Sequence, residues 1–212
     1  MNKISAAIIV FIGGFAIMVL EIIGARFLAR FFGSSFYVWI SQIGVILIAL
    51  SIGYYIGGWL ADYFKRASFA GLLLIPAGIY SFLVPSFAPS VMDAIVLRHP
   101  AERDIPMIWQ KLDPAIGSAI FFLLPCFVLA ILSPYVIRMT SRHLSHVGRI
   151  SGLVYAFSTV GSIAGVFASG YILIDHMGIS DIIRATGVLT VALGIFCLIA
   201  DVCFRTQIQD NR

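Results

Sequence analysis

The run FFGSSFYVWISQIGVILIALSIGYYIGGWLA, residues Phe31–Ala61, contains 31 residues without a single Asp, Glu, Lys or Arg. A helix needs about 20 mostly apolar residues to cross the roughly 30 Å hydrocarbon core of a bilayer, and this run exceeds that length. Lipid offers no hydrogen-bond partner to backbone N–H and C=O groups, whereas a continuous helix satisfies them internally. The run therefore predicts a transmembrane helix and decides the fold class.

Five further charge-free runs surround it, and they are Ile4–Leu20, Ala67–Met92, Pro114–Ile137, Ile150–Ile174 and Ala185–Ala200. Of the 212 residues 60% are apolar and 11% are charged, whereas an average soluble domain carries about 25% charged residues. No piece between the runs is long enough to bury a core of its own, which excludes a soluble enzyme domain. The sequence predicts one all-α integral membrane domain, residues 1–212. Its six spans are expected near residues 4–27, 37–60, 68–91, 115–137, 150–174 and 182–203, with an outer loop at 92–113.

The orientation in the membrane follows from Lys and Arg in the short connections, because these residues are retained on the cytoplasmic side. With the N-terminus inside, the inner segments carry eight such residues and the outer segments carry five. Both termini are therefore expected in the cytoplasm, with the protein in the cell (inner) membrane. The net charge of +4 is assigned to anchoring at the inner leaflet, so the lipid bilayer and not nucleic acid is the expected partner. The cysteines form no C-x-x-C or Cys/His array, so no metal or cofactor is expected.

Glycine recurs with the spacing G-x8-G-x3-G at an offset of 108 residues. The two sets are Gly44, Gly53 and Gly57 against Gly152, Gly161 and Gly165, and Arg30 matches Arg138 at the same offset. Three spans per set bring the second set into the membrane from the opposite side, so we expect two inverted-topology three-helix repeats, half of a facilitator-like bundle. Chance recurrence among 19 glycines is the alternative.

Small residues four apart let transmembrane helices approach closely, which favours Gly53-x3-Gly57 and Gly161-x3-Gly165 as packing faces. Gly58 is expected to contribute to the same kind of contact. A subunit interface or a moving contact is the alternative role for these glycines.

Glu21 is the one acid that lies clearly inside a predicted span, and Arg26 and Arg30 follow it. A charge in hydrocarbon costs several kcal/mol unless it is paired, hydrated or close to the interface. Either the arginines extend to the interface while Glu21 bonds to a neighbouring helix, or Glu21 binds a cationic substrate or relays a proton. The candidates for substrate binding or proton coupling are Glu21, Arg26, Arg30, Gln42, Tyr54, Tyr155 and Ser158.

The segment Gly57–Arg66 resembles the cytoplasmic loop signature of the major facilitator superfamily, G-x3-D-[RK]-x-G-[RK]-[RK]. Gly58 and Asp62 match, and Lys65 and Arg66 close the segment. Tyr63 replaces the basic residue after the acid, and the second glycine is missing. A charged helix end with basic residues on the cytoplasmic side explains the same letters.

Two longer stretches resemble the membrane portion of the fused facilitator/spermidine-synthase family. The first contains E-x4-R at Glu21, then G-S-S and L-S-x-G-Y, and the second runs from Gly148 to Gly178. Ser158 stands where that family is expected to have Asn. The resemblance implies a transporter-like module for a small cationic or polyamine-related solute, with a homodimer supplying the twelve spans of a facilitator.

The aminopropyltransferase-like domain of that family is expected to be absent, because only residues 205–212 follow Phe204. We therefore expect no enzyme activity in this chain. The resemblance implies that a separate cytoplasmic spermidine-synthase-like protein supplies that domain.

Two other functions fit the residues. The first is a non-transporting anchor, or a small subunit of a larger membrane complex, that recruits a partner. Its support is the basic inner surface of Arg138, Arg142, His143, His146 and Arg149. The second is a membrane-embedded enzyme, supported only by Asp175, His176 and Asp181 in the outer segments, for which plain solvation is the simpler interpretation.

Overall fold

The fold is seen in a computed structural model that describes residues 3–64, 66–99, 105–140 and 147–209, with side chains from 4 to 202 within those ranges. Among the predicted residues, Lys65, Arg142, His143 and His146 lie outside them. The helices are α1 (Lys3–Phe32), α2 (Phe36–Tyr63), α3 (Ala67–Val96), α4 (Met107–Ser118), α5 (Leu124–Thr140), α6 (Val147–Ala168), α7 (Ile174–His176) and α8 (Ile179–Gln209). The described residues contain no β-strand.

Two short π-helical turns join some of these helices end to end. The first turn, η1 (Ala119–Leu123), links α4 to α5, and the second, η3 (Ser169–Leu173), links α6 to α7. The described ranges therefore contain six continuous segments that are long and apolar enough to cross a membrane. The predicted all-α, six-helix membrane fold is confirmed.

The turn η1 has a local cause in the sequence. Pro125 lies two residues beyond its last residue and has no backbone N–H, which leaves a carbonyl of the preceding turn without its helical partner. The backbone then widens to the π form, and Tyr80 of α3 donates a hydrogen bond from its hydroxyl to the carbonyl of Ile120. Such substitution of side-chain bonds for lost backbone bonds is how membrane helices tolerate proline.

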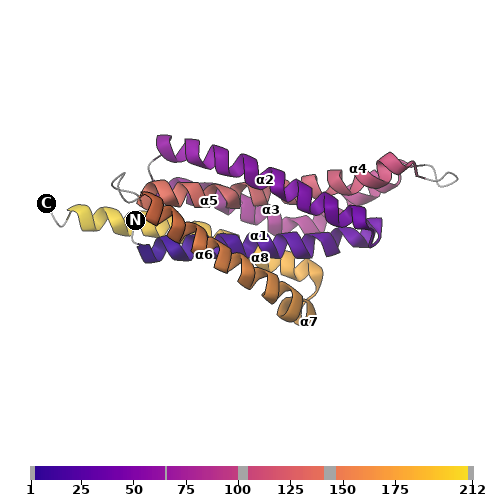
Figure 1. Cartoon of the computed structure of the whole chain (residues 1–212). Coiled ribbons are helices and arrows are strands. Elements are labelled where there is room, and N and C mark those ends of the chain that lie inside the picture. The colour runs from indigo at the N-terminus through magenta and orange to yellow at the C-terminus, as the bar shows by residue number, and fades with distance from the viewer. Residues whose placement is uncertain (1–2, 65, 100–104, 141–146, 210–212) are drawn as a thin grey trace.

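The ends of the spans differ from the predicted boundaries. Helix α3 continues to Val96, and the fourth span begins at Met107, so the connection is 97–106 rather than the expected 92–113. Gly33 has φ of +76° in the link between α1 and α2, a backbone conformation that glycine adopts without strain. Helix α1 begins and α8 ends at the same end of the bundle, as expected for a chain with both termini on one side (Figure 1).

The helices pack in pairs that a two-fold rotation would exchange. Helix α1 packs along α6 as α2 packs along α5, and α1 meets α8 as α5 meets α3, while α3 and α8 pack along each other. With the three-helix sets taken as α1–α3 and α4–α8, all of these contacts join one set to the other, and exchanging the sets turns each contact into another on the same list. Because three spans separate the sets, the axis of this relation lies in the membrane plane.

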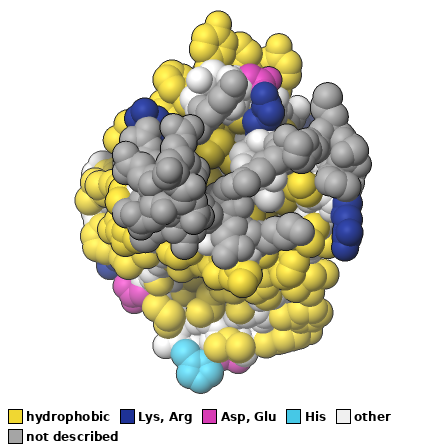
Figure 2. All heavy atoms as spheres, turned by 90° about the vertical axis from the view of Figure 1, so that its left-hand side faces the viewer, with side chains coloured by type: hydrophobic (Ala, Val, Ile, Leu, Met, Phe, Trp, Pro, Cys, Tyr) yellow, Lys and Arg dark blue, Asp and Glu magenta, His cyan; other side chains and the backbone are white. Residues whose placement is uncertain are grey.

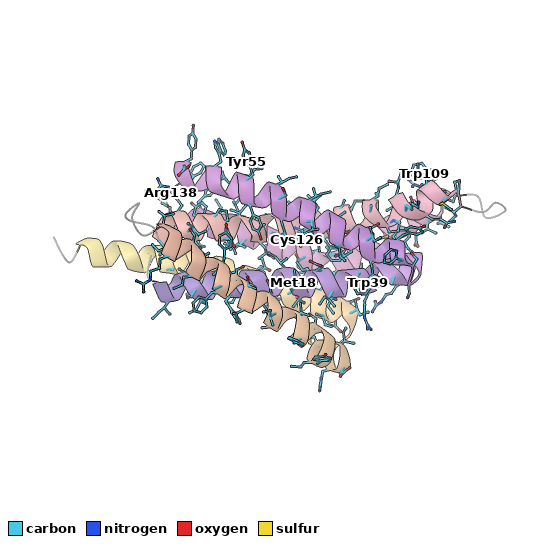
Figure 3. All side chains as sticks on the ribbon, in the orientation of Figure 1. Met18, Trp39, Tyr55, Trp109, Cys126 and Arg138 are labelled. Atoms are coloured by element: carbon cyan, nitrogen blue, oxygen red, sulfur yellow. The ribbon has the colours of Figure 1, made fainter. Side chains whose placement is uncertain are left out.

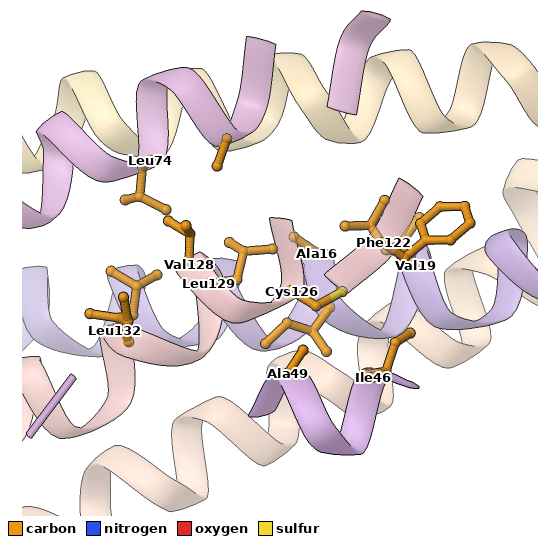
Figure 4. Packing of buried hydrophobic residues seen from close by; sticks show 14 of the residues in the cluster. Ala16, Val19, Ile46, Ala49, Leu74, Phe122, Cys126, Val128, Leu129 and Leu132 are labelled. Carbon is orange, nitrogen blue, oxygen red and sulfur yellow. The ribbon is translucent and has the colours of Figure 1, made fainter. Parts of the chain in front are cut away.

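The hydrophobic core is centred on α5, as Figure 4 shows. Cys126 and Leu129 of α5 are buried beside Ala16 of α1 and Ala49 of α2. Val128 points to the other side, toward Leu74 of α3. The buried cysteine thus acts as a small apolar packing group.

The outer surface is hydrophobic around the bundle. Viewed from the end that carries the start of α1, hydrophobic side chains cover the flanks and the few charged ones lie toward the rim (Figure 2). On α2 and α6 large apolar residues point outward along the whole span, among them Leu47 and Phe167. This distribution is what contact with lipid tails requires.

Candidate functional site

Glycines position the helices that surround the candidate site. A Cβ added at Gly53 would lie 2.6 Å from the carbonyl oxygen of Phe127, and one at Gly161 would lie 2.0 Å from that of Phe11. The next glycine in each helix repeats the contact one turn on, Gly57 against Ile131 and Gly165 against Phe15. The four predicted packing glycines therefore make equivalent contacts in the two sets.

The same contacts correct two details of the predicted repeat. The contacted helices are related by 116 residues, since Phe11 corresponds to Phe127, so Arg30 and Arg138, which are 108 apart, are not equivalent. In addition, a Cβ at Gly44, Gly58 or Gly152 would meet nothing within 4 Å. Among the described residues, neither Gly58 nor the first glycine of each set packs closely against another helix.

A second symmetric glycine contact was not predicted. Gly71 and Gly78 of α3 lie against the backbones of Gly194 and Gly187 of α8, respectively. The spacing G-x6-G occurs in both helices at an offset of 116 residues, which is the sequence signal that would have revealed it.

Glu21 lies on α1 between the sides that face α6 and α2. Met18, almost one turn earlier, is beside Gly165 of α6, and Gly24, almost one turn later, is beside Gln42 of α2. Residues three apart on a helix are neighbours, which places Glu21 between these two contacts. Figure 3 shows Met18 on the stretch of α1 that is seen between α2 and α6.

The carboxylate of Glu21 is half-buried and has no hydrogen bond or ion pair with any described residue. The nearby arginines do not compensate it. Arg26 is exposed, and Arg30 donates from Nη1 to Ser180 Oγ at 3.4 Å while its guanidinium lies 6.0 Å from the ring centre of Phe27. Of the first predicted arrangement, the arginines that point outward are seen, but a bond from Glu21 to a described residue of a neighbouring helix is not.

Tyr54, Tyr155 and Ser158 lie on α2 and α6, and the contact of Ser158 with α1 is seven residues before Glu21, about 10 Å along the helix. Tyr54 of α2 and Tyr155 of α6 are both exposed. Ser158 is partly buried and its carbonyl oxygen touches α1 at Gly14. We define the α2/α6 face by these three residues and Glu21. Helices α2 and α6 pack mainly on α5 and α1, respectively.

Gln42 is placed differently from the other candidates, because it is completely buried. Its Nε2 donates to the carbonyl oxygen of Leu20 at 3.2 Å, and its Oε1 accepts a bond from Ser118 Oγ at 2.7 Å. The amide therefore joins α1, α2 and α4, and both of its ends are occupied. Its position suits helix packing rather than contact with a solute.

Asp62 forms an ion pair with Arg138, whose Nε lies 2.6 Å from Asp62 Oδ1. Both side chains are exposed, and the pair links the ends of α2 and α5 near the start of α1. Exposed pairs contribute about 0–1 kcal/mol.

Two features were not predicted from the sequence. Ser162 of α6 donates a hydrogen bond to the Gly14 carbonyl at 3.3 Å. The buried carboxylate of Asp113 is paired with Arg98 and His99.

Metal-binding groups and similarity to known proteins were the two remaining sources of information on this site. The described residues hold no group of three or more His, Cys, Asp or Glu side chains that could bind a metal ion. Asp175, His176 and Asp181 are all exposed near the η3 end of α6. Comparison of the chain with family models, curated proteins and solved structures finds no match. The class that the fold defines is a polytopic α-helical membrane protein.

Proposed function

We propose that this protein is a transporter-like membrane module for a small cationic solute, with Glu21 as the group that binds the cation or takes up a coupled proton. The observation that carries the proposal is the half-buried Glu21, whose carboxylate has no hydrogen bond or ion pair with a described residue. An intramembrane acid without a protein partner is costly, and a cation or proton is the ligand that would compensate it.

The arrangement of the helices supports the same proposal. Inverted three-helix sets place their shared centre near the membrane midplane, where transporters of this architecture bind their solutes. Helix α1 has 30 residues and begins at Lys3, and Glu21 lies 18 residues after Lys3. Glu21 is therefore slightly beyond the middle of the helix. A polyamine is the solute we propose, on the resemblance of the Glu21–Gly58 and Gly148–Gly178 stretches to the fused facilitator/spermidine-synthase family.

A second copy of the chain would complete the site. The hydroxyls of Tyr54 and Tyr155 face outward within spans, where lipid tails offer them no hydrogen bond. We propose a homodimer that covers the α2/α6 face and brings the number of spans to that of a facilitator. Catalysis forms no part of the proposed function.

The experiment is uptake of radiolabelled spermidine into proteoliposomes that contain the purified protein. The proposal expects uptake well above that of empty liposomes, driven by the spermidine gradient or by an imposed proton gradient. Uptake equal to that of empty liposomes under both conditions would overturn it. In that case, recovery of a stoichiometric cytoplasmic partner with the protein from gentle detergent would favour the anchor function instead.

A further inference from the structure

Ser169, in the turn η3, has a buried hydroxyl that lacks a partner. The residue is completely buried, and its Oγ forms no hydrogen bond with any described residue. Ser81, Thr186 and Thr190 are also buried within spans, but each donates to the backbone carbonyl four residues earlier in its own helix. Ser169 lacks even this common bond. A buried hydroxyl without a partner costs free energy, so the position calls for one.

The backbone at Ser169 is unusual as well. Ser169 is the first residue of the π-helical turn η3, and its carbonyl accepts a bond from the N–H of Ile174, five residues later. Single π turns occur often at functional sites. Helix α6 runs along α1 toward α7, and η3 packs against α1 (Figure 1). A side-chain partner for Ser169 is therefore expected on α1.

The register between α6 and α1 places Ser169 beside Glu21. The two helices run parallel, because successive glycines of α6 contact successive turns of α1 in the same order. Ser162 Oγ donates to the Gly14 carbonyl at 3.3 Å. Seven residues are almost two turns of a helix, so residues seven later in both helices face each other again. These residues are Ser169 on α6 and Glu21 on α1.

Glu21 is also the only polar side chain that this part of α1 can offer. Between Ser5 and Arg26, every other residue of α1 is glycine or has an apolar side chain. Glu21 is half-buried, and its carboxylate has no hydrogen bond or ion pair with a described residue. Two polar groups without partners therefore meet at one level of the contact between α1 and α6.

The helices around α1 do not neutralise a charge at this level. Within the neighbouring spans the titratable side chains are thiols and phenols, which are neutral at neutral pH. Examples are Cys126 of α5, Tyr54 of α2, Tyr155 of α6, Tyr171 of η3 and Cys197 of α8. The described acids and bases of α2, α4, α5, α6 and α8 lie toward the ends of those helices. Hydrocarbon disfavours a charge without a partner, which favours the neutral form of the Glu21 carboxyl.

We infer that Glu21 and Ser169 form a proton-binding pair, in which Glu21 takes a proton from water and its neutral carboxyl bonds to the Ser169 hydroxyl. A protonated carboxyl and a hydroxyl each carry one donor and at least one acceptor, so each can donate to the other. The only covalent bond formed is the O–H bond of Glu21. Because Ser169 is completely buried, a proton, which needs no space, suits the position better than a larger cation.

The pair identifies the coupled ion of the proposed transport, and this consequence rests on the proposed function. A solute cation that binds the Glu21 carboxylate must displace the proton, because both neutralise the same charge. The solute would then move in exchange for a proton.

The test is infrared difference spectroscopy of the protein in lipid bilayers, between acidic and alkaline buffer. A protonated carboxyl has a carbonyl stretching band that an ionised carboxylate lacks, and a hydrogen bond to that carbonyl lowers the frequency of the band. We expect Glu21→Gln to lose one such band. In Ser169→Ala the same band should move to higher frequency, because the carbonyl loses its hydrogen bond. Ser51→Ala, the same change at an exposed position of α2, should leave the band unchanged.

The frequency separates a hydrogen bond from a purely structural role of Ser169, which would not move the band. Absence of a Glu21 band in acidic buffer, or the wild-type frequency in Ser169→Ala, would overturn the inference. The measurement uses no solute, so it does not depend on spermidine uptake. A protein that shows both expected changes but takes up no spermidine would refute the transport proposal alone.

Discussion

Replacement of Glu21 by glutamine is expected to lower spermidine uptake by about tenfold or more, which corresponds to the loss of about 1.4 kcal/mol of binding to the transported cation. The amide keeps the size of the side chain but removes the negative charge. Glu21 has no hydrogen bond or ion pair with a described residue. The substitution should therefore leave the fold unchanged, and the effect should appear in uptake alone.

The matched control is Asp93→Asn, the same acid-to-amide change at an exposed position near the end of α3. Spermidine uptake by this variant should equal that of the wild type. Thermal unfolding in detergent should be unchanged in both variants. Uptake by Glu21→Gln at the wild-type rate would show that the carboxylate does not bind the transported cation.

The second large effect concerns stability. Gly161→Ala places a methyl group where the backbone oxygen of Phe11 is 2.0 Å away, and Gly53→Ala does the same at 2.6 Å from that of Phe127. A backbone carbonyl cannot rotate away as a side chain can, so helices α6 and α2 must move off their partners. We expect each variant to lose about 1–3 kcal/mol of unfolding free energy, as for other overpacked interiors.

Gly152→Ala is the control for this prediction, because a Cβ there meets nothing within 4 Å. Alanine is favoured over glycine inside a helix by about 0.5–1 kcal/mol, so this variant should be as stable as the wild type or slightly more stable. Unfolding in mixed micelles with increasing dodecyl sulfate measures all three variants. If Gly161→Ala is no less stable than Gly152→Ala, the symmetric glycine contacts do not hold the helices together.

The spans were predictable because absence of charge over 20 or more residues is a strong and local signal. The start of the fourth span was not, since Asp113 ends the charge-free run in the sequence. In the structure that carboxylate is buried within the helix and is compensated by Arg98 and His99, which are 15 and 14 residues away. Compensation by residues that lie just beyond the end of another helix leaves no trace in a count of charges.

The candidate site was predictable in part. The cost of an intramembrane charge points to Glu21, and the glycine spacing points to Gly53, Gly57, Gly161 and Gly165, which lie in close helix contacts. The partners of these glycines are backbone carbonyl oxygens, including those of Phe11 and Phe127. Every residue has such an oxygen, so no sequence pattern identifies the residues that the glycines contact. The offset of 116 residues between the two contacted helices is therefore not predictable from the glycine spacing. The predicted solute contact of Gln42 does not fit its complete burial against Ser118, which depends on how three helices meet and is not visible in the sequence.

The most direct test of the proposed site is chemical modification of Glu21 by dicyclohexylcarbodiimide, an apolar reagent that reacts with protonated carboxyl groups within membranes. The protein in liposomes is treated with and without spermidine, and the modified residues are identified by mass spectrometry. We predict that Glu21 is modified and that spermidine, but not an equal ionic strength of sodium chloride, protects it. Failure of the reagent to modify Glu21, or modification that spermidine does not reduce, would contradict a cation site at this carboxylate.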